Sequence, residues 1–570
     1  MRRAITRLTL LTVVLCTCAH AQPAKNVVLM VADGAGPTTW RAANQWQFGD
    51  LANTAPEFSQ VYEQGGFAQH WMATYSGHNQ PLPPGQTEAR LGLPLPPGTL
   101  PDILPPLWNE LPIPKFGSYD PAKANDTTPG DVRVWANDSG SLLGDRGPQV
   151  DLTPVESNPP FVQLLADQLE DANTVRAHLD QGPVAYDYLI WDSITDSASA
   201  GSALASGIRT YNSSINYTLD GQPAPFITEQ MKALGKRAGV VTTKPFTDAT
   251  PAVFGTQNDF RDDEAEISDA MIRNGLLDVI ITPGHPEFGG GGASRGTPDY
   301  GTISSDNLEG LRDGTLGWTL VETVEELNDI GSGTLLAPER LFGLVPVSSS
   351  LNSRDTTGQT SAYDPRVHAP GEEPEGVVPF VMPGLETLTM AAINSLETDP
   401  DGFFLMVENA SVDSAAHANN VPQMVEEMLA FNRAVDAVVN WIETESSWDE
   451  TLLIITTDHA NGLFLGPDSD TVPFQDPVAG APGELPAGIF WTTNHTNELV
   501  PLWARGPGSE RFALLGEGVD PTRGTYFHIS DVHGVMSVAV VPLPAAWLFG
   551  ASGMLAFGAF VRRPGRVTAT

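Results

Sequence analysis

A serine preceded by an acid stands at the start of a segment of small residues. Asp196 and Ser197 lie near the beginning of TDSASAGSALASGIRTYN, and residues Ala198 to Ser206 are mostly Ala, Ser and Gly, which predicts a tightly packed helix. A hydroxyl group at a helix N-terminus meets free N–H groups and the positive end of the helix dipole, which favour an alkoxide or a phosphate. Asp and Ser are also common helix caps, so these two residues alone leave a nucleophile and a simple cap equally open.

Three predicted strands run into acidic residues. These strands and their acids are Asn26 to Ala32 with Asp33, Gly402 to Val407 with Glu408, and Thr451 to Thr456 with Asp458. In open α/β sheets, ligands bind at the carboxyl ends of the strands. Buried carboxylates that are pressed together repel one another unless cations neutralise them. The pattern therefore predicts a metal centre at this edge of a sheet.

Histidines accompany these acids. His459 directly follows Asp458, and His495 stands further along in HTNELVPLWARGPG. Asp413 and His417 are spaced i and i+4, which places both side chains on one face of a helical turn, where they can bind one metal ion together. A single histidine is more often a structural residue, but packing does not readily explain the whole set. The histidines strengthen the prediction of a metal centre.

The elements that must position these residues alternate between strand and helix. Further predicted strands are residues 188–191, 238–243 and 277–282, and predicted helices are residues 227–237, 262–274, 385–396 and 421–445. This alternation is typical of an α/β fold with a mainly parallel sheet. Residues 76–160 are rich in Pro and Gly without clear periodicity, which indicates a long insertion. The Gly-rich stretch 289–292 lacks the helix and lysine of a phosphate-binding loop and is interpreted as an ordinary loop.

Six segments, in this order along the chain, resemble the alkaline phosphatase family. They are VVLMVADGAGP, TDSASAG with SGIRTYN, TTKPFTDATPAVF, FFLMVENASVDSAAH, LLIITTDHA and HTNELVPLWARGPG, and they extend from about residue 26 to about residue 505. The resemblance implies a three-layer sandwich, with a mainly parallel central sheet flanked by helices, in a catalytic domain over residues 22–540. It also implies a hydrolase that releases inorganic phosphate from phosphate monoesters through a phosphoserine on Ser197.

The same resemblance implies two zinc ions and one magnesium ion. Asp413, His417 and His495 would hold one zinc ion, and Asp33, Asp458 and His459 would hold the second, which faces Ser197. Asp33, Thr250 and Glu408 would hold magnesium, with Asp248 supporting its water shell, and Arg261 would clamp two phosphate oxygens with its planar guanidinium. Zinc would make the serine hydroxyl more acidic and stabilise the leaving oxygen. Ser414 departs from the many relatives that carry a longer basic or aromatic residue there.

Two other functions stay open at this point. One is a phosphodiesterase of the same superfamily; a sulfatase is disfavoured because Ala198, Ser199 and Ala200 do not supply the Pro-x-Arg that follows a sulfatase nucleophile. The other is a surface-anchored metal-binding protein without catalytic activity. The presence of Ser197 and Arg261 together with every implied ligand favours the enzyme, because a structural metal site needs neither a nucleophile nor a phosphate clamp.

The two end segments predict export. Arginines precede the apolar run Leu8 to Leu15, which is typical of a secretory signal peptide over residues 1–21. In residues 541–570, an apolar run is followed by arginines, and the segment resembles a PEP-CTERM sorting signal, although Leu543 stands where that pattern usually has Glu. A plain C-terminal membrane anchor explains the same residues. The expected location is periplasmic, cell-surface or extracellular.

The charge of the chain limits its partners. The formal net charge is −39, which excludes nucleic-acid binding through bulk charge. An anionic substrate therefore needs a locally positive site, which metal ions can supply. The expected partners are small phosphate esters, a membrane or cell surface through the C-terminal segment, and a second copy of the chain in a homodimer.

Overall fold

The computed structural model describes residues 23–50, 59–76, 119–127, 184, 186–191, 194–351, 361–368 and 382–541. The predicted signal peptide, the C-terminal segment beyond residue 541 and most of the predicted insertion lie outside these residues. Within the described part of the chain, no helix has the length and apolar character needed to cross a membrane.

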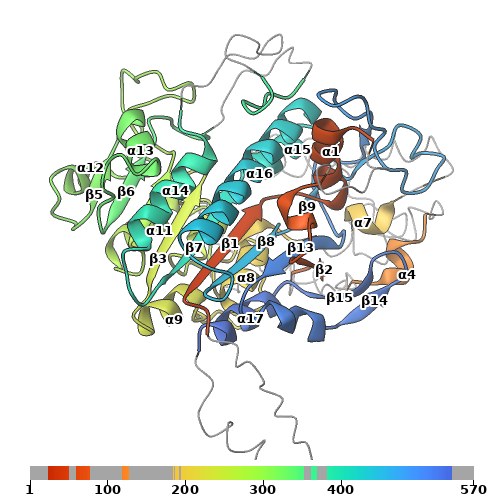
Figure 1. Cartoon of the computed structure of the whole chain (residues 1–570), viewed down its shortest axis with the longest axis horizontal. Helices are drawn as coiled ribbons and strands as arrows, with labels where there is room; N and C mark the ends of the chain where they lie inside the picture. The colour runs from red at the N-terminus through yellow and green to blue at the C-terminus, as the bar shows by residue number, and fades with distance from the viewer. Residues whose placement is uncertain are drawn as a thin grey trace, which may run out of the picture.

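The described residues form one large sheet of 11 strands (Figure 1). In spatial order the strands are β14 (Gly518–Asp520), β15 (Gly524–His528), β2 (Ala68–Ala73), β13 (Val500–Arg505), β8 (Thr451–Thr456), β1 (Asn26–Ala32), β7 (Phe403–Asn409), β3 (Arg237–Thr242), β4 (Val279–Thr282), β6 (Leu341–Leu344) and β5 (Thr319–Val321).

The strands from β8 to β5 run parallel, and within the described part of this sheet the antiparallel pairs lie on the β13 side. The prediction of a mainly parallel sheet is confirmed. β1 lies between β7 and β8, with Val31 opposite both Glu408 and Thr456. This register brings the carboxyl ends of three strands, and the acids that belong to them, to one edge of the sheet.

Helices cover both faces of the sheet. Along β1, Val27, Leu29 and Val31 join one apolar cluster, while the alternate side chains join a second cluster on the opposite face. The first cluster includes residues of α8 (Ser197–Ser206), α9 (Ile227–Ala233), α10 (Ala249–Ala252), α11 (Glu264–Arg273), α12 (Ser305–Arg312) and α17 (Asp531–Ala539). The second includes residues of α1 (Pro37–Phe48), α13 (Val324–Gly331), α14 (Leu385–Leu396), α15 (Ser411–His417) and α16 (Val421–Thr444), and Figure 1 shows α14 and α16 crossing the sheet. The predicted three-layer sandwich is confirmed.

One predicted strand is a helix. Residues 188–191 belong to α7 (Asp187–Trp191). The side chains of Tyr188, Leu189 and Ile190 are buried in a separate cluster that also contains Tyr119 and Trp491, next to the β2 and β15 side of the sheet. A short apolar run is compatible with either a buried strand or a buried helix turn, so its periodicity did not distinguish them.

The other predicted elements form, with differences at their ends. β1, β8 and α14 have the predicted bounds. α9 ends at Ala233 rather than at residue 237, because Gly235 adopts φ +81° and β3 begins at Arg237. Residues 289–292 form a loop closed by a bridge between Phe288 and Ser294, which agrees with the prediction of an ordinary loop.

Candidate metal centre

Ser197 is the first residue of α8, and Asp196 is the N-cap of that helix. One carboxylate oxygen of Asp196 accepts a hydrogen bond from the Ser199 backbone N–H at 2.9 Å, and the other accepts one from the Ser213 backbone N–H at 2.8 Å. Because Asp196 caps the helix, the Ser197 hydroxyl is not used for capping and lies at the positive end of the helix dipole.

Small residues let α8 pack closely on the neighbouring helix. A side chain at Gly201 would lie 3.0 Å from Cγ2 of Val253, the residue that caps the C-terminus of α10. This contact explains the segment of Ala, Ser and Gly after Ser197. It also fixes the relative positions of the two helices whose N-termini carry Ser197 and Thr250.

The Ser197 hydroxyl contacts His459, and His459 in turn lies close to Asp458 and Asp33. Nε2 of His459 lies 3.1 Å from Ser197 Oγ, 3.2 Å from Asp458 Oδ2 and 3.4 Å from Asp33 Oδ1. We call Ser197, Asp33, Asp458 and His459 the Ser197 cluster; each is at most 5% exposed. Ligands of a tetrahedral zinc ion, bound at about 2.0–2.2 Å, lie about 3.3–3.6 Å apart. The donor types are those that bind zinc, and the distances of 3.1, 3.2 and 3.4 Å are at or slightly below this spacing.

Two carboxylate oxygens of this cluster point to the same conclusion. Asp33 Oδ1 and Asp458 Oδ2 are buried without a hydrogen-bond partner among the described residues. A buried carboxylate oxygen without a partner is costly. A cation bound between them would satisfy both.

Gly34 allows the end of β1 to approach a second cluster. It adopts φ +72°, and a Cβ atom at this position would lie 2.7 Å from Asp413 Oδ1. Its backbone N–H donates a hydrogen bond to Asp458 Oδ1 at 3.3 Å. Glycine tolerates both the left-handed backbone and the close contact, so Asp33 and Asp413 can lie near each other.

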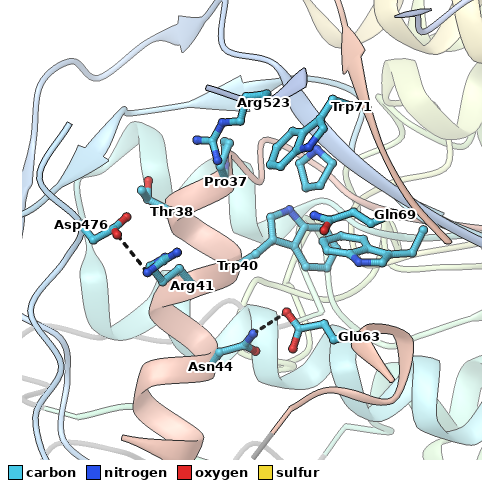
Figure 2. Close-up of a pocket in the computed structure, with 12 residues that line it drawn as sticks. Pro37, Thr38, Trp40, Arg41, Asn44, Glu63, Gln69, Trp71, Asp476 and Arg523 are labelled. Atoms are coloured by element: carbon cyan, nitrogen blue, oxygen red, sulfur yellow. Dashed lines mark hydrogen bonds and ion pairs between the residues drawn. The ribbon is translucent and has the colours of Figure 1, made fainter. Parts of the chain in front are cut away.

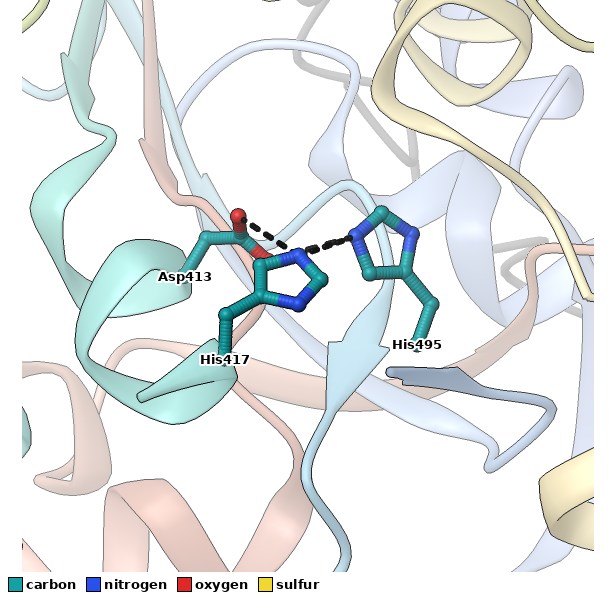
Figure 3. Close-up of side chains that lie close together, drawn as sticks. All are labelled: Asp413, His417 and His495. Carbon is teal, nitrogen blue, oxygen red and sulfur yellow. Dashed lines mark hydrogen bonds and ion pairs between the residues drawn. The ribbon is translucent and has the colours of Figure 1, made fainter. Parts of the chain in front are cut away.

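The second cluster consists of Asp413, His417 and His495 (Figure 3). Nε2 of His417 lies 3.3 Å from Asp413 Oδ2, Nε2 of His495 lies 3.4 Å from Asp413 Oδ1, and the two Nε2 atoms are 3.1 Å apart. We call this the His417 cluster. Two of these distances match the edges of a tetrahedral zinc site and the third is slightly shorter, so these residues can hold a zinc ion as well.

The hydrogen bonds of the outer ring nitrogens favour the same interpretation. Nδ1 of His417 donates to the Thr493 carbonyl, and Nδ1 of His495 donates to the Thr195 carbonyl at 2.8 Å. In neutral rings, the lone pairs are then on the two Nε2 atoms, which face each other. Histidines that bind a metal ion commonly donate their other ring N–H to a carbonyl group in the same way. Burial opposes protonation of His495, but the hydrogen bond to Asp413 and its charge raise the pKa of His495 above the usual value. Either a proton or a cation must separate the two lone pairs.

The two clusters adjoin. The rings of His459 and His495 stack with their centroids 3.7 Å apart. Asp413 also lies close enough to Asp33 and His459 for one ligand atom from each to surround a single ion. The geometry therefore permits two cations side by side, with Ser197 facing one of them.

Glu408, Thr250 and Asp248 supply further oxygen donors, and we call them the third group; the charge of Glu408 acts on Asp33. Glu408 accepts a hydrogen bond from Thr242 Oγ1, and Oγ1 of Thr250 is buried without a hydrogen-bond partner in the described part of the chain. Burial, followed by the charge of Asp248, raises the pKa of Glu408 to about 8, and burial with neighbouring carboxylates raises the pKa of Asp33 well above its ordinary value. Carboxylates this crowded ionise readily only with cations among them. Oxygen donors suit magnesium.

Arg261 lies between two acids near Ser197. NH2 of its guanidinium is 2.8 Å from Asp248 Oδ1, and NH1 is 3.2 Å from Asp196 Oδ2. Because Asp196 directly precedes Ser197, this pairing holds the guanidinium close to the start of α8. Burial opposes the charge of Arg261, but Asp248 and Asp196 outweigh it and raise the pKa of the guanidinium. The group is a permanent cation available to an anion.

Lys244 also lies at this site and was not predicted from the sequence. Its Nζ atom lies 3.5 Å from Asp248 Oδ2. The sequence feature that could have indicated it is its place four residues before Asp248, in the segment TTKPFTDATPAVF. Asn461, which donates a hydrogen bond to Asp413 Oδ1 at 2.7 Å, was not predicted either. The eleven residues singled out from the sequence, by contrast, all lie in or beside the two clusters and the third group.

A separate hollow of about 280 Å³ lies beside the start of α1. Figure 2 shows Arg41 directed towards Asp476, at 2.9 Å, and Arg523 close to Trp71, whose ring centroid lies 4.5 Å from the guanidinium carbon. None of the residues of the Ser197 cluster, the His417 cluster or the third group lines it. This hollow is therefore not the predicted phosphate site.

Comparison with known proteins gives consistent matches. The alkaline phosphatase family model matches residues 164–481. Alkaline phosphatase 4 of Bacillus subtilis is 25% identical over 390 residues, which cover 58% of this chain and 75% of that protein. The alkaline phosphatase of the Antarctic bacterium TAB5 has a TM-score of 0.51 at 18% identity and covers 91% of this chain and 99% of its own.

A variant of the Antarctic enzyme is described with Mg bound in its M3 site, and it has a TM-score of 0.50 at 17% identity, covering 91% of this chain and 99% of its own. At these identities the solved structures establish the likeness of the fold alone. The family match spans more than half of the chain. It includes Ser197 and Arg261, while Asp33 and His495 lie outside the matched residues.

Proposed function

The chain belongs to the alkaline phosphatase family, and on that premise we propose that it hydrolyses phosphate monoesters to inorganic phosphate and an alcohol, through a phosphoserine on Ser197. The observation that carries this proposal is the 3.1 Å approach of Ser197 Oγ to His459 Nε2, beside two carboxylate oxygens that have no hydrogen-bond partner among the described residues. A hydroxyl that served only as a helix cap would have no need of a neighbouring imidazole with two carboxylates beside it.

We propose two zinc ions and one magnesium ion as cofactors. The Ser197 cluster and the His417 cluster would each hold a zinc ion, and Asp33, Thr250 and Glu408 would hold magnesium, with Asp248 supporting its water shell. The donor types and spacing within each cluster and the oxygen donors of the third group support this assignment. The magnesium described in the variant Antarctic enzyme is a further support. When bound, these ions would lower the pKa of the serine hydroxyl and of water and would neutralise the developing charge.

The side chains of this protein would divide the reaction into two displacements. In the first, Ser197 Oγ attacks phosphorus, the P–O bond to the alcohol breaks, and the alcohol leaves as it takes up a proton. In the second, water attacks the phosphoserine, phosphate leaves, and the serine hydroxyl is restored. Arg261 would bind two phosphate oxygens throughout, because its planar fork matches their geometry. The N-terminus of α8 would favour the negative charge on Ser197 and on the phosphoryl group.

Ser197→Ala tests the proposal, and Ser199→Ala is its matched control. Ser199 lies in the same helix, and its hydroxyl donates to the Thr210 carbonyl, away from the clusters. We expect Ser197→Ala and a metal chelator each to abolish hydrolysis of p-nitrophenyl phosphate, and Ser199→Ala to leave it nearly unchanged. Hydrolysis that persists in Ser197→Ala and after chelation would overturn the proposal.

Two alternatives predict different results with the same preparation. A phosphodiesterase would hydrolyse bis(p-nitrophenyl) phosphate faster than the monoester. A catalytically silent metal-binding protein would retain metal and hydrolyse neither. The closeness of Ser197 and Arg261 to the metal-binding residues favours an enzyme over the silent protein.

We also propose that the protein is exported, with residues 1–21 removed and residues 541–570 acting as a sorting signal or membrane anchor, and that it forms a homodimer. The support is the composition of the two end segments and, for the homodimer, the family. Mass analysis of protein secreted by the native host would locate both ends. Light scattering on the purified protein would give its oligomeric state.

A further inference from the structure

Lys244 is a largely buried cation at the edge of the carboxylate groups. Its side chain is 25% exposed, and Nζ lies 3.5 Å from Asp248 Oδ2. The lysine is two residues beyond the end of β3, in the loop that leads to α10. It is not among the residues that we assigned to a cation or to the phosphate.

The backbone of Lys244 is tied to the third group of oxygen donors. Its N–H donates to Thr242 Oγ1 at 3.1 Å, and the same hydroxyl donates to Glu408. Its carbonyl accepts a hydrogen bond from Thr282 Oγ1 at 3.1 Å. The backbone of Lys244 is therefore fixed relative to Glu408, and the side chain extends from this point to Asp248.

The negative charges that act on Lys244 are those of the metal-binding residues. Although burial opposes its charge, Asp248, Asp413, Asp33 and Glu408 keep the ammonium group ionised. Three of these four carboxylates are the ones we assigned to magnesium or its water shell. A fixed positive charge and a divalent cation in this group share the same carboxylates and repel each other.

Asp248 is also shared with the phosphate clamp. Its Oδ2 faces Lys244, while its Oδ1 accepts a hydrogen bond from Arg261 at 2.8 Å. Both oxygens of this carboxylate therefore already face cations of the protein itself. A magnesium ion or its water shell must compete with Lys244 for Asp248.

We propose that Lys244 is a positioning residue that sets the magnesium affinity of this enzyme: its ammonium group neutralises part of the negative charge of Asp248, Asp33 and Glu408, and so makes the third cation bind more weakly. The consequence is an enzyme whose carboxylate group is partly neutralised by its own lysine when magnesium is scarce. This inference rests on the proposed cation-binding role of those carboxylates.

The test is magnesium binding by zinc-loaded protein, measured by isothermal titration calorimetry and by elemental analysis after dialysis. Lys244→Met removes the charge but keeps a side chain of similar length, and Lys244→Arg keeps the charge. We expect Lys244→Met to bind Mg²⁺ about tenfold more tightly or better than the wild type, because the repulsion is gone. Lys244→Arg should remain close to the wild type. Lys244→Gln is a second neutral variant with the same expectation as Lys244→Met.

Lys232→Met is the matched control. Lys232 is 28% exposed and forms an ion pair with Asp278 at 2.7 Å, outside the three groups. Its loss should leave the magnesium affinity unchanged. A lysine with a purely structural role would, when removed, loosen the site and weaken Mg²⁺ binding, so tighter binding separates the two explanations.

Two results would overturn the inference, and they have different meanings. In the first, the wild type binds Mg²⁺, but folded Lys244→Met and Lys244→Gln bind it with unchanged or lower affinity. This result rules out the role of Lys244 and leaves the proposed function intact. A zinc-loaded wild type that binds no Mg²⁺ contradicts the cation assignment itself.

Discussion

Oγ of Ser197 lies 3.1 Å from Nε2 of His459, although the two residues are 262 positions apart in the sequence. The contact forms because α8 begins at Ser197 where β8 ends, and because Asp196 caps the helix in place of Ser197. His459 lies against the serine hydroxyl, and Asp33 and Asp458 lie close to the same imidazole nitrogen. Asp196 is the cap of the helix, and we propose that Ser197 is the nucleophile.

His417→Ala should remove one of the two zinc ions. His417 supplies one of the three donors in its cluster, and its side chain is 40% exposed, so truncation leaves no large cavity in the core. We expect elemental analysis to find one zinc ion fewer per chain at submicromolar free zinc. The control is His533→Ala, because Nδ1 of His533 also bonds a backbone carbonyl, that of Ala205. Equal zinc content in the two variants would refute the His417 site.

Arg261→Lys should weaken phosphate binding although it keeps the charge. Lysine cannot present two parallel N–H groups to two oxygens, and a charge-assisted hydrogen bond contributes about 1.5–3 kcal/mol. We expect the inhibition constant for inorganic phosphate to rise by roughly tenfold to a hundredfold. Arg209→Lys is the control, since Arg209 pairs with Glu517 away from the site at 2.8 Å. The clamp is ruled out if phosphate inhibits both variants equally.

Gly34→Ala should lower the free energy of unfolding by more than backbone strain alone would. The new Cβ atom would meet Asp413 at 2.7 Å, whereas a Cβ atom at Gly221, which has a similar φ of +75°, would lie within 4 Å of no described residue other than its chain neighbours. We expect Gly221→Ala to lose about 1 kcal/mol of unfolding free energy, and Gly34→Ala to lose more and to release zinc to a chelator. If chelator competition shows the same zinc affinity in both variants, the close approach of Gly34 to Asp413 does not matter for metal binding.

Glu498→Gln should stabilise the protein at high pH only. Glu498 is 8% exposed and accepts a hydrogen bond from Thr496 Oγ1 at 3.0 Å. Burial raises its pKa to about 7, with Arg523 and Thr496 opposing the shift. Since the folded pKa lies above the unfolded value of about 4.3, stability from the protonated carboxyl is fully present below about pH 4 and is lost as the pH rises through 7.

The stabilisation by Glu498→Gln should therefore be near zero at about pH 4 and approach about 3 kcal/mol at about pH 9. Denaturant unfolding of the wild type and the variant, at saturating metal, gives this difference directly. A difference that does not vary with pH would mean that Glu498 does not titrate in this range in the folded protein.

The sheet could be predicted from the sequence because each of its central strands has a recognisable local pattern of residues. β1 and β8 are short apolar runs bounded by polar residues, and both form with the predicted bounds. The run 188–191 carries the same signal and is α7, because its apolar side chains pack against Tyr119 and Trp491, which are distant in the sequence. Local periodicity contains no information about such partners.

The candidate site was predictable in its residue types but not in its supporting contacts. Asp413 and His417 were linked by their spacing along one helical turn, and the strand-end acids by the rule for parallel sheets. The carbonyl groups of Thr195 and Thr493, which orient the two imidazoles, have no side-chain signature. Lys244 was missed because a lysine beside carboxylates in the sequence is usually a surface residue, and only the fold shows it largely buried.

We propose that Ser197 carries the phosphoryl group during turnover. The direct measurement is acid quenching of the zinc- and magnesium-loaded enzyme during hydrolysis of a phosphate monoester, followed by proteolysis and mass spectrometry. We predict a peptide that has gained one HPO₃ group on Ser197 and that is absent from Ser197→Ala. A phosphoryl group on another residue, or none on any peptide from a sample with verified turnover, would contradict the claim.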